Sequence, residues 1–203
     1  MLKTFVKINK VNNLSDARYC AGMGVNDLGF NIEPGTMHYL SPDDYKEVVE
    51  WVAGIRPVAE LTTTSGEVAK QLLAKYSVGA IQVSTMEQLE ICKGLGLPVI
   101  FNSNAGDINS LLKQIDLEAQ ALIEYLLISV DSIDEIASLA TVASTYKVVI
   151  EGNFSAAEFE DLLINHPYLH GIALTGGEEI RAGYKDFDEL AEVLEALEQE
   201  EEY

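Results

Sequence analysis

Cysteine is scarce in this sequence, which excludes several classes of protein. Cys20 and Cys92 are the only cysteines among 203 residues. Two cysteines so far apart do not form a disulfide framework or a zinc motif. Both lie in predicted helices among apolar or small residues, so we interpret them as core residues. We therefore expect a cytoplasmic protein and no metal site.

Basic residues are also few. The chain has 13 Lys and Arg residues against 33 Asp and Glu residues, which gives a formal net charge of −20. Binding to nucleic acid or to an anionic membrane depends on Lys and Arg side chains that neutralise phosphates. We expect neither partner. The same charge disfavours small anionic ligands, unless their site is locally positive or rich in backbone N–H groups.

Long apolar runs are absent from the sequence. No run approaches the roughly 20 residues that a membrane-spanning helix needs. A strand pattern begins within a few residues of Met1, without a basic segment followed by an apolar stretch, so we expect no secretory signal. The composition is that of an ordinary soluble globular protein.

Short β-type runs alternate with amphipathic helical runs along the whole chain. About eight such units with short connections predict a single (β/α)8 TIM-barrel domain over residues 1–203, with a doubly wound open sheet as the alternative. The predicted strands are Phe5–Asn9, Asp27–Ile32, Pro57–Thr62, Ala80–Val83, Pro98–Asn102, Tyr125–Val130, Lys147–Ile150 and Leu169–Leu174. The helices predicted between them include Leu14–Met23, Ser65–Lys75, Asp107–Leu117 and Ser132–Ser144, and the last helix runs from Phe187 to about Glu198.

The loops after the seventh and eighth strands are the usual place for a phosphate site in a barrel of this kind. Here these loops contain Gly152 and Asn153, and then Thr175, Gly176 and Gly177. Glycines let the backbone approach an anion closely, and the following helical turn directs N–H groups at it. The alternative is that the two glycines only form a tight turn. Glu151 disfavours a phosphate because a carboxylate beside it is repulsive.

Several segments resemble one enzyme family in their order and spacing. They are Lys7-Ile8-Asn9-Lys10, Asn13-Leu14-Ser15-Asp16-Ala17, Gly24 to Phe30, Pro34 to Pro42, Ile81-Gln82-Val83-Ser84, Gly176-Gly177-Glu178 and Gly183-Tyr184-Lys185-Asp186. Together they are similar to phosphoribosylanthranilate isomerase of tryptophan biosynthesis. The resemblance covers essentially the whole chain and is weakest in its middle.

This resemblance implies a fold and a reaction. The family is a (β/α)8 barrel that isomerises a phosphoribosylated anthranilate by an Amadori rearrangement and uses no cofactor. In the family a cysteine at the end of the first strand is the general base. An aspartate at the end of the sixth strand is the general acid. The reaction needs both proton-transfer groups at the reacting sugar carbon.

The residues that would carry this reaction are replaced here. Asn9 stands at the base position, and an amide does not titrate usefully. Ile128 stands where the acid is expected, although Asp131 follows closely. The glycine after the base is Lys10, and a substrate-binding arginine of the family is His38. The histidine after the fourth strand is replaced by Ser84, and the Ser-Gly-Gly loop after the seventh strand reads Glu151-Gly152-Asn153.

Three hypotheses follow from these replacements. The first is a divergent family member that has lost, or nearly lost, the isomerase reaction and still binds a sugar phosphate or another small ligand. The second is an active isomerase with Lys10 as base and Asp131 as acid. The third is a barrel with an interaction role or unrelated chemistry, for which Asn31, His38, Gln82 and Glu151 are the candidate residues at the barrel mouth. A monomer or a homodimer is expected.

Overall fold

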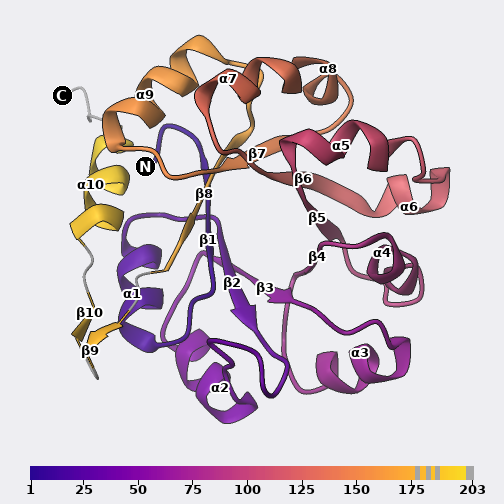
Figure 1. Ribbon diagram of the computed structural model, residues 1–203. Coiled ribbons are helices and arrows are strands. Elements are labelled where there is room, and N and C mark those ends of the chain that lie inside the picture. Colours follow the sequence, from indigo (N-terminus) through magenta and orange to yellow (C-terminus); the bar gives the residue numbers. More distant parts are fainter. Residues whose placement is uncertain (177–178, 182–183, 186–187, 200–203) are drawn as a thin grey trace.

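The chain folds into a closed barrel of eight parallel strands surrounded by helices, as Figure 1 shows. The computed structural model describes residues 1–176, 179–181, 184–185 and 188–199. Each strand pairs with the next in the chain, and the eighth pairs with the first, so the predicted (β/α)8 fold is confirmed and the open-sheet alternative is wrong. The barrel strands are β1 (Phe5–Asn9), β2 (Asp27–Asn31), β3 (Arg56–Glu60), β4 (Ala80–Val83), β5 (Val99–Asn104), β6 (Ile123–Ser129), β7 (Val148–Glu151) and β8 (Gly171–Thr175).

Polar side chains begin most of the surrounding helices. Asn13, Ser41, Ser65, Thr85, Asp116 and Ser155 each accept a hydrogen bond from a first-turn N–H group, which would otherwise lack a partner. The helices are α1 (Leu14–Gly22), α2 (Pro42–Glu50), α3 (Gly66–Leu73), α4 (Met86–Cys92), α5 (Ala105–Leu112), α6 (Leu117–Leu122), α7 (Ile133–Ile136), α8 (Ala140–Ala143), α9 (Ala156–Asn165) and α10 (Asp188–Ala196).

Three segments differ from the sequence-based expectation. The predicted helix Asp107–Leu117 is shorter, and Asp116 instead starts the additional helix α6. The predicted helix Ser132–Ser144 is divided into α7, a 3-10 turn at Ala137–Leu139, and α8. Strands β9 (Glu179–Arg181) and β10 (Tyr184–Lys185) form an antiparallel pair after the barrel, which the pattern did not predict. Phe187, the predicted first residue of the last helix, lies outside the described residues.

Side chains along each strand point alternately into two different hydrophobic cores. One set of residues fills the inside of the barrel: Val58, Ala80, Ile100, Tyr125, Leu127, Val149 and Ala173. The residues between them face outward into a larger cluster that includes Ile8, Phe30, Ile81, Phe101 and Ile128, packed beneath the helices. Successive strand residues point to opposite faces, so the inner set also identifies the residues that reach the barrel mouth.

An ion-pair network closes the amino-terminal end of the barrel. Arg56 donates to both carboxylate oxygens of Asp27, at 2.9 and 2.7 Å, and to Glu124 at 2.6 Å. Tyr125 donates its hydroxyl to the same Asp27 at 2.9 Å. The hydrogen bond to Asp27 is the main reason that the pKa of Arg56 is raised. These groups lie at the end of the barrel associated with stability, so we assign them a structural role.

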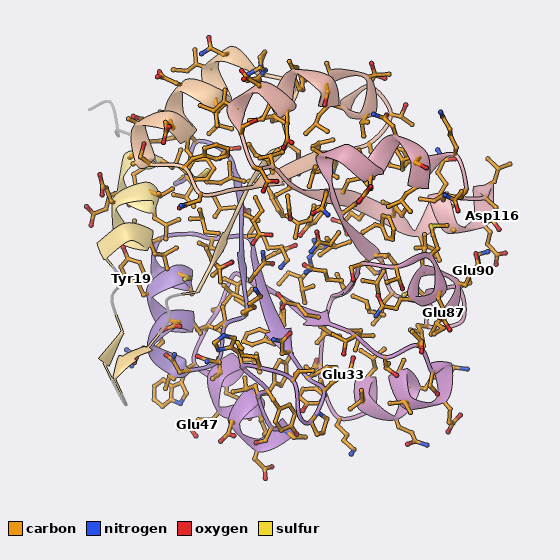
Figure 2. All side chains as sticks on the ribbon, viewed as in Figure 1. Tyr19, Glu33, Glu47, Glu87, Glu90 and Asp116 are labelled. Atoms are coloured by element: carbon orange, nitrogen blue, oxygen red, sulfur yellow. The ribbon has the colours of Figure 1, made fainter. Side chains whose placement is uncertain are left out.

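Acidic side chains cover the outside of the helix ring. Figure 2 shows Glu47, Glu87, Glu90 and Asp116 at the outer edge of the molecule, and all four are exposed.

The two cysteines are both buried and free. Burial raises the pKa of the Cys20 thiol to about 12 and that of the Cys92 thiol to about 11. None of the helices in the described ranges is both long and apolar enough to cross a membrane.

Gly171 tests the tightness of the barrel. A Cβ atom there would lie 2.0 Å from the carbonyl oxygen of Phe5 on the paired strand β1, and a backbone atom cannot move aside cheaply. Overpacking a core typically costs about 1–3 kcal/mol. We expect Gly171→Ala to lower the free energy of unfolding by about 3 kcal/mol or more, as measured by urea denaturation.

Gly22 supplies the matched control for this substitution. It is exposed at the end of α1, its backbone is not left-handed, and a Cβ there would have no neighbour within 4 Å. Gly22→Ala should leave stability unchanged or raise it by up to about 1 kcal/mol. Equal effects of the two substitutions would contradict the close approach of β8 to β1.

Candidate functional site

The carboxyl end of the barrel carries one inward-facing polar residue from each strand. Each of these residues lies two positions after a residue that lines the inside of the barrel, or continues the same alternation on β1 and β2. We call this set the mouth ring: Asn9, Asn31, Glu60, Gln82, Asn102, Ser129, Glu151 and Thr175. The ring includes all of the predicted mouth candidates except His38.

A buried ion pair joins one residue of the mouth ring to a lysine in the layer beneath it. Lys7 on β1 is fully buried, and its Nζ lies 3.3 Å from Oε1 of Glu60, which is 7% exposed. Gly29 on β2 provides the space for this pair, because a Cβ atom there would lie 1.9 Å from Glu60 Oε1 and 2.8 Å from Lys7 Nζ. A charge is costly to bury unless it is paired and hydrogen-bonded, so these residues depend on one another.

Asn9 connects this ion pair to the opposite side of the mouth. Its Oδ1 accepts a short hydrogen bond from Lys7 Nζ, and its Nδ2 donates to Glu151 Oε1 at 2.7 Å. Thr175 Oγ1 donates to the same carboxylate oxygen at 3.2 Å. Both ends of the Asn9 amide are therefore engaged, and its oxygen faces the cation while its N–H group faces the carboxylate.

The two loops beside β1 and β2 contain non-glycine residues in left-handed backbone conformations. Lys10 has φ 56° and His38 has φ 61°. The Lys10 N–H group donates to Glu60 Oε1 at 3.2 Å, which holds this turn against the buried pair. His38 Nδ1 lies 2.9 Å from Asn12 Nδ2, which joins the two loops. Such residues cost conformational energy and persist where their surroundings hold them in place.

Two donors in the loops of the predicted phosphate site are engaged within the protein. The Thr175 hydroxyl donates to Glu151, and the Gly176 N–H group donates to the Asn9 carbonyl oxygen at 2.9 Å. The ring of Phe154 packs over Gly152, because a Cβ atom added to Gly152 would lie 2.4 Å from Cε2 of Phe154. Asn153 is exposed, and Gly177 lies outside the described residues. Phosphate binding at these loops stays a prediction.

The end of β6 places its polar group one residue later than the expected acid position. Ile128 is fully buried in the outer cluster beneath the helices, and Ser129 faces the mouth. The substitute acid, Asp131, is exposed, and its N–H group donates to Glu135 Oε2 at 2.9 Å. Lys10, the substitute base, is also exposed. The structure therefore does not bring Lys10, Asp131 and the mouth ring together in one buried site.

A pocket of about 240 Å3 opens at the carboxyl ends of β4, β5 and β6. Strand-end residues Ser84, Asn102, Ser103, Asn104 and Ser129 form one wall, and Asp107 and Leu111 of α5 form the other. The sequence analysis identified Ser84 only as the replacement of a family histidine, and it did not identify the other residues of this pocket. It also missed Lys7 and Glu60, although a lysine within the apolar run Val6-Lys7-Ile8 was an available signal.

Comparisons with known proteins agree with the barrel and with its similarity to one enzyme. No protein-family model matches the chain, and a search of curated proteins gave no match. Among solved structures, the chain is similar to phosphoribosylanthranilate isomerase from Thermotoga maritima, at 18% identity, with a TM-score of 0.76 over 96% of this chain and 98% of that one. The enzyme from Thermus thermophilus is 21% identical, with a TM-score of 0.73 over 95% and 98% of the two chains.

A third similar solved structure is a phosphoribosylanthranilate isomerase in complex with reduced 1-(o-carboxyphenylamino)-1-deoxyribulose 5-phosphate. It is 20% identical to this chain, with a TM-score of 0.74 over 96% of this chain and 98% of that one. The class of protein is therefore a (β/α)8 barrel with a polar mouth. The particular fold is that of phosphoribosylanthranilate isomerase, as the resemblance predicted.

The buried ion pair gives a direct test of the mouth network. Glu60→Gln leaves the Lys7 ammonium buried without a carboxylate, and breaking such a pair typically costs about 3–5 kcal/mol. We expect a loss of about 3 kcal/mol in the free energy of unfolding measured in urea. The double variant Lys7→Met, Glu60→Gln should recover most of that loss, because it removes the unpaired charge.

An exposed pair provides the control. Lys46 and Glu50 on α2 lie 3.7 Å apart with side chains 72% and 62% exposed. Glu50→Gln should change stability by no more than about 0.5 kcal/mol. If Glu60→Gln were equally mild, Lys7 would not depend on Glu60 for its burial.

Proposed function

We propose that this chain is a phosphoribosylanthranilate-isomerase-like barrel that does not catalyse the Amadori rearrangement and uses its mouth to bind a small ligand. The observation that carries the proposal is the state of Asn9. It occupies the position of the general base, but it is an amide, and both of its ends are held by Lys7 and Glu151. An amide so placed neither removes a proton nor turns toward a substrate.

The acid side of the reaction also lacks a suitable group. Ile128 is apolar and packs away from the mouth, and the hydroxyl of Ser129 is a poor proton donor near neutral pH. General acid–base groups typically contribute about 10²–10⁴-fold each to a rate. Loss of both groups therefore supports a protein that retains the fold without the activity.

The mouth also disfavours the family's anionic substrate. Glu60 and Glu151 are both in the mouth ring, and Lys7 is fully buried against Glu60 rather than exposed to a ligand. The net charge of −20 adds no attraction for a phosphate or for an anthranilate carboxylate. These features support a site whose preferred ligand is not the phosphoribosyl compound.

The isomerase assay decides the main proposal. Purified protein should give no turnover of phosphoribosylanthranilate above a buffer control. The gene should also fail to restore growth of an isomerase-deficient tryptophan auxotroph under conditions in which an active isomerase does so. Rescue at an ordinary level would overturn the proposal.

Displaced catalytic groups are tested by one double variant. Lys10 and Asp131 are both exposed, and a lysine acts as a base near neutrality only when it is desolvated or placed beside another cation. Lys10→Ala, Asp131→Ala should leave any trace of measured isomerisation unchanged. A rate that disappears in this variant would instead assign the base and acid to these two residues.

Sugar-phosphate binding is the second candidate function. It is supported by the pairing of β7 with β8, which places the Gly152 and Gly176 loops on neighbouring strands. Reduced 1-(o-carboxyphenylamino)-1-deoxyribulose 5-phosphate is the probe, and Glu151 is the residue that opposes it by charge repulsion. We expect weak binding in calorimetry that tightens about tenfold in Glu151→Gln, equivalent to about 1.4 kcal/mol.

Glu47 on α2 supplies the control for this substitution, because it is exposed at the outer edge of the molecule (Figure 2). Glu47→Gln changes the net charge by the same amount and should leave the affinity unchanged. Similar gains in the two variants would show that net charge, and not the carboxylate of Glu151 in the mouth, limits binding.

A further inference from the structure

The pocket between β4 and β6 is a different part of the mouth from the predicted phosphate loops. Its walls come from β4, β5, β6 and α5, whereas the phosphate loops follow β7 and β8. Its volume of about 240 Å3 is just below the roughly 300–1,000 Å3 of sites for drug-sized ligands. The pocket therefore suits a ligand smaller than a drug molecule.

The groups around this pocket are both donors and acceptors. Serine hydroxyls and asparagine amides can each donate and accept hydrogen bonds, and Ser84, Asn102 and Ser129 supply such groups from three strands. Within the described part of the chain, Asp107 is the only charged residue in the lining, and no Lys or Arg takes part. A ligand that complements this surface must also both donate and accept.

The positive end of the α5 helix dipole and the negative carboxylate of Asp107 together disfavour ionic ligands of either sign. Within the described residues, Asn104 precedes α5 without a side-chain hydrogen bond to its first turn. The N–H groups of that turn lack intrahelical partners and carry the positive end of the helix dipole, which disfavours a cation. The carboxylate of Asp107 lines the same pocket and disfavours an anion. An uncharged hydroxyl can accept a hydrogen bond from these N–H groups and donate one to the Asp107 carboxylate.

We propose that the β4–β6 pocket binds a small, uncharged, hydroxyl-rich ligand of monosaccharide size. The inference rests on the proposed function in one respect, namely that the mouth is a binding site rather than the site of the isomerase reaction. Adjacent hydroxyls of the ligand form hydrogen bonds with the Asp107 carboxylate and the amide of Asn102. Another hydroxyl accepts from the first turn of α5.

Ligand-observed NMR titration of the full chain tests the ligand class. The probes are D-ribose, D-xylose and ribitol as uncharged ligands, ribose 5-phosphate as the anion, and ethanolamine as the cation. At least one uncharged probe should bind saturably and more tightly than either charged probe. Tighter binding of ribose 5-phosphate or of ethanolamine, or no saturable binding of any uncharged probe, would overturn the proposal.

Paired variants locate the binding. Asn102→Ala removes one donor and one acceptor from the pocket wall and should weaken binding of the uncharged probe about 2–10-fold, the loss expected for one hydrogen bond. Asn165→Ala makes the same change at an exposed position at the end of α9 and should leave the affinity unchanged. Equal effects of the two variants, or none from Asn102→Ala, would place the ligand elsewhere and overturn the assignment.

The outcome is independent of the isomerase assay. Turnover of phosphoribosylanthranilate would overturn the proposed loss of activity, whatever the NMR titration shows. Absence of turnover together with a preference for ribose 5-phosphate would overturn only the assignment of an uncharged ligand. The two proposals therefore fail on different measurements.

Discussion

The buried contact between Lys7 and Glu60 determines how the rest of the barrel mouth is arranged. A lysine inside a barrel must keep a partner, because an isolated ammonium in a low-dielectric interior is costly. Glu60 supplies that partner at 3.3 Å, and Asn9 turns its oxygen toward the same ammonium. The amide nitrogen of Asn9 must then face Glu151, which in turn engages the hydroxyl of Thr175.

The polar groups of the mouth are arranged differently on its two sides. On the side formed by β1, β3, β7 and β8, polar groups are engaged with one another. On the β4–β6 side, serine and asparagine groups surround an open pocket instead. A barrel can change in this way because its strands determine where side chains are presented, and the side chains alone determine what they can bind or convert.

Sequence reasoning predicted the strands well and the site less well. Alternation of apolar residues placed all eight barrel strands, and the amide at position 9 led to the hypothesis that the fold is present without the family's reaction. The acid position was assigned to Ile128, but the inward residue at this strand end is Ser129. A shift of one residue exchanges the two faces of a strand, so a site prediction needs an exact register where a strand prediction does not.

The sequence by itself determined the repeated strand–helix units, most helix starts and the strongly acidic charge, because these depend on residues that are near in the chain or on composition. Only the tertiary structure decided which polar groups meet. Lys7 and Glu60 are 53 positions apart, and Asn9 and Glu151 are 142 apart. Their contacts arise because the barrel closes with each strand at one particular register, which brings distant strand ends around a single mouth.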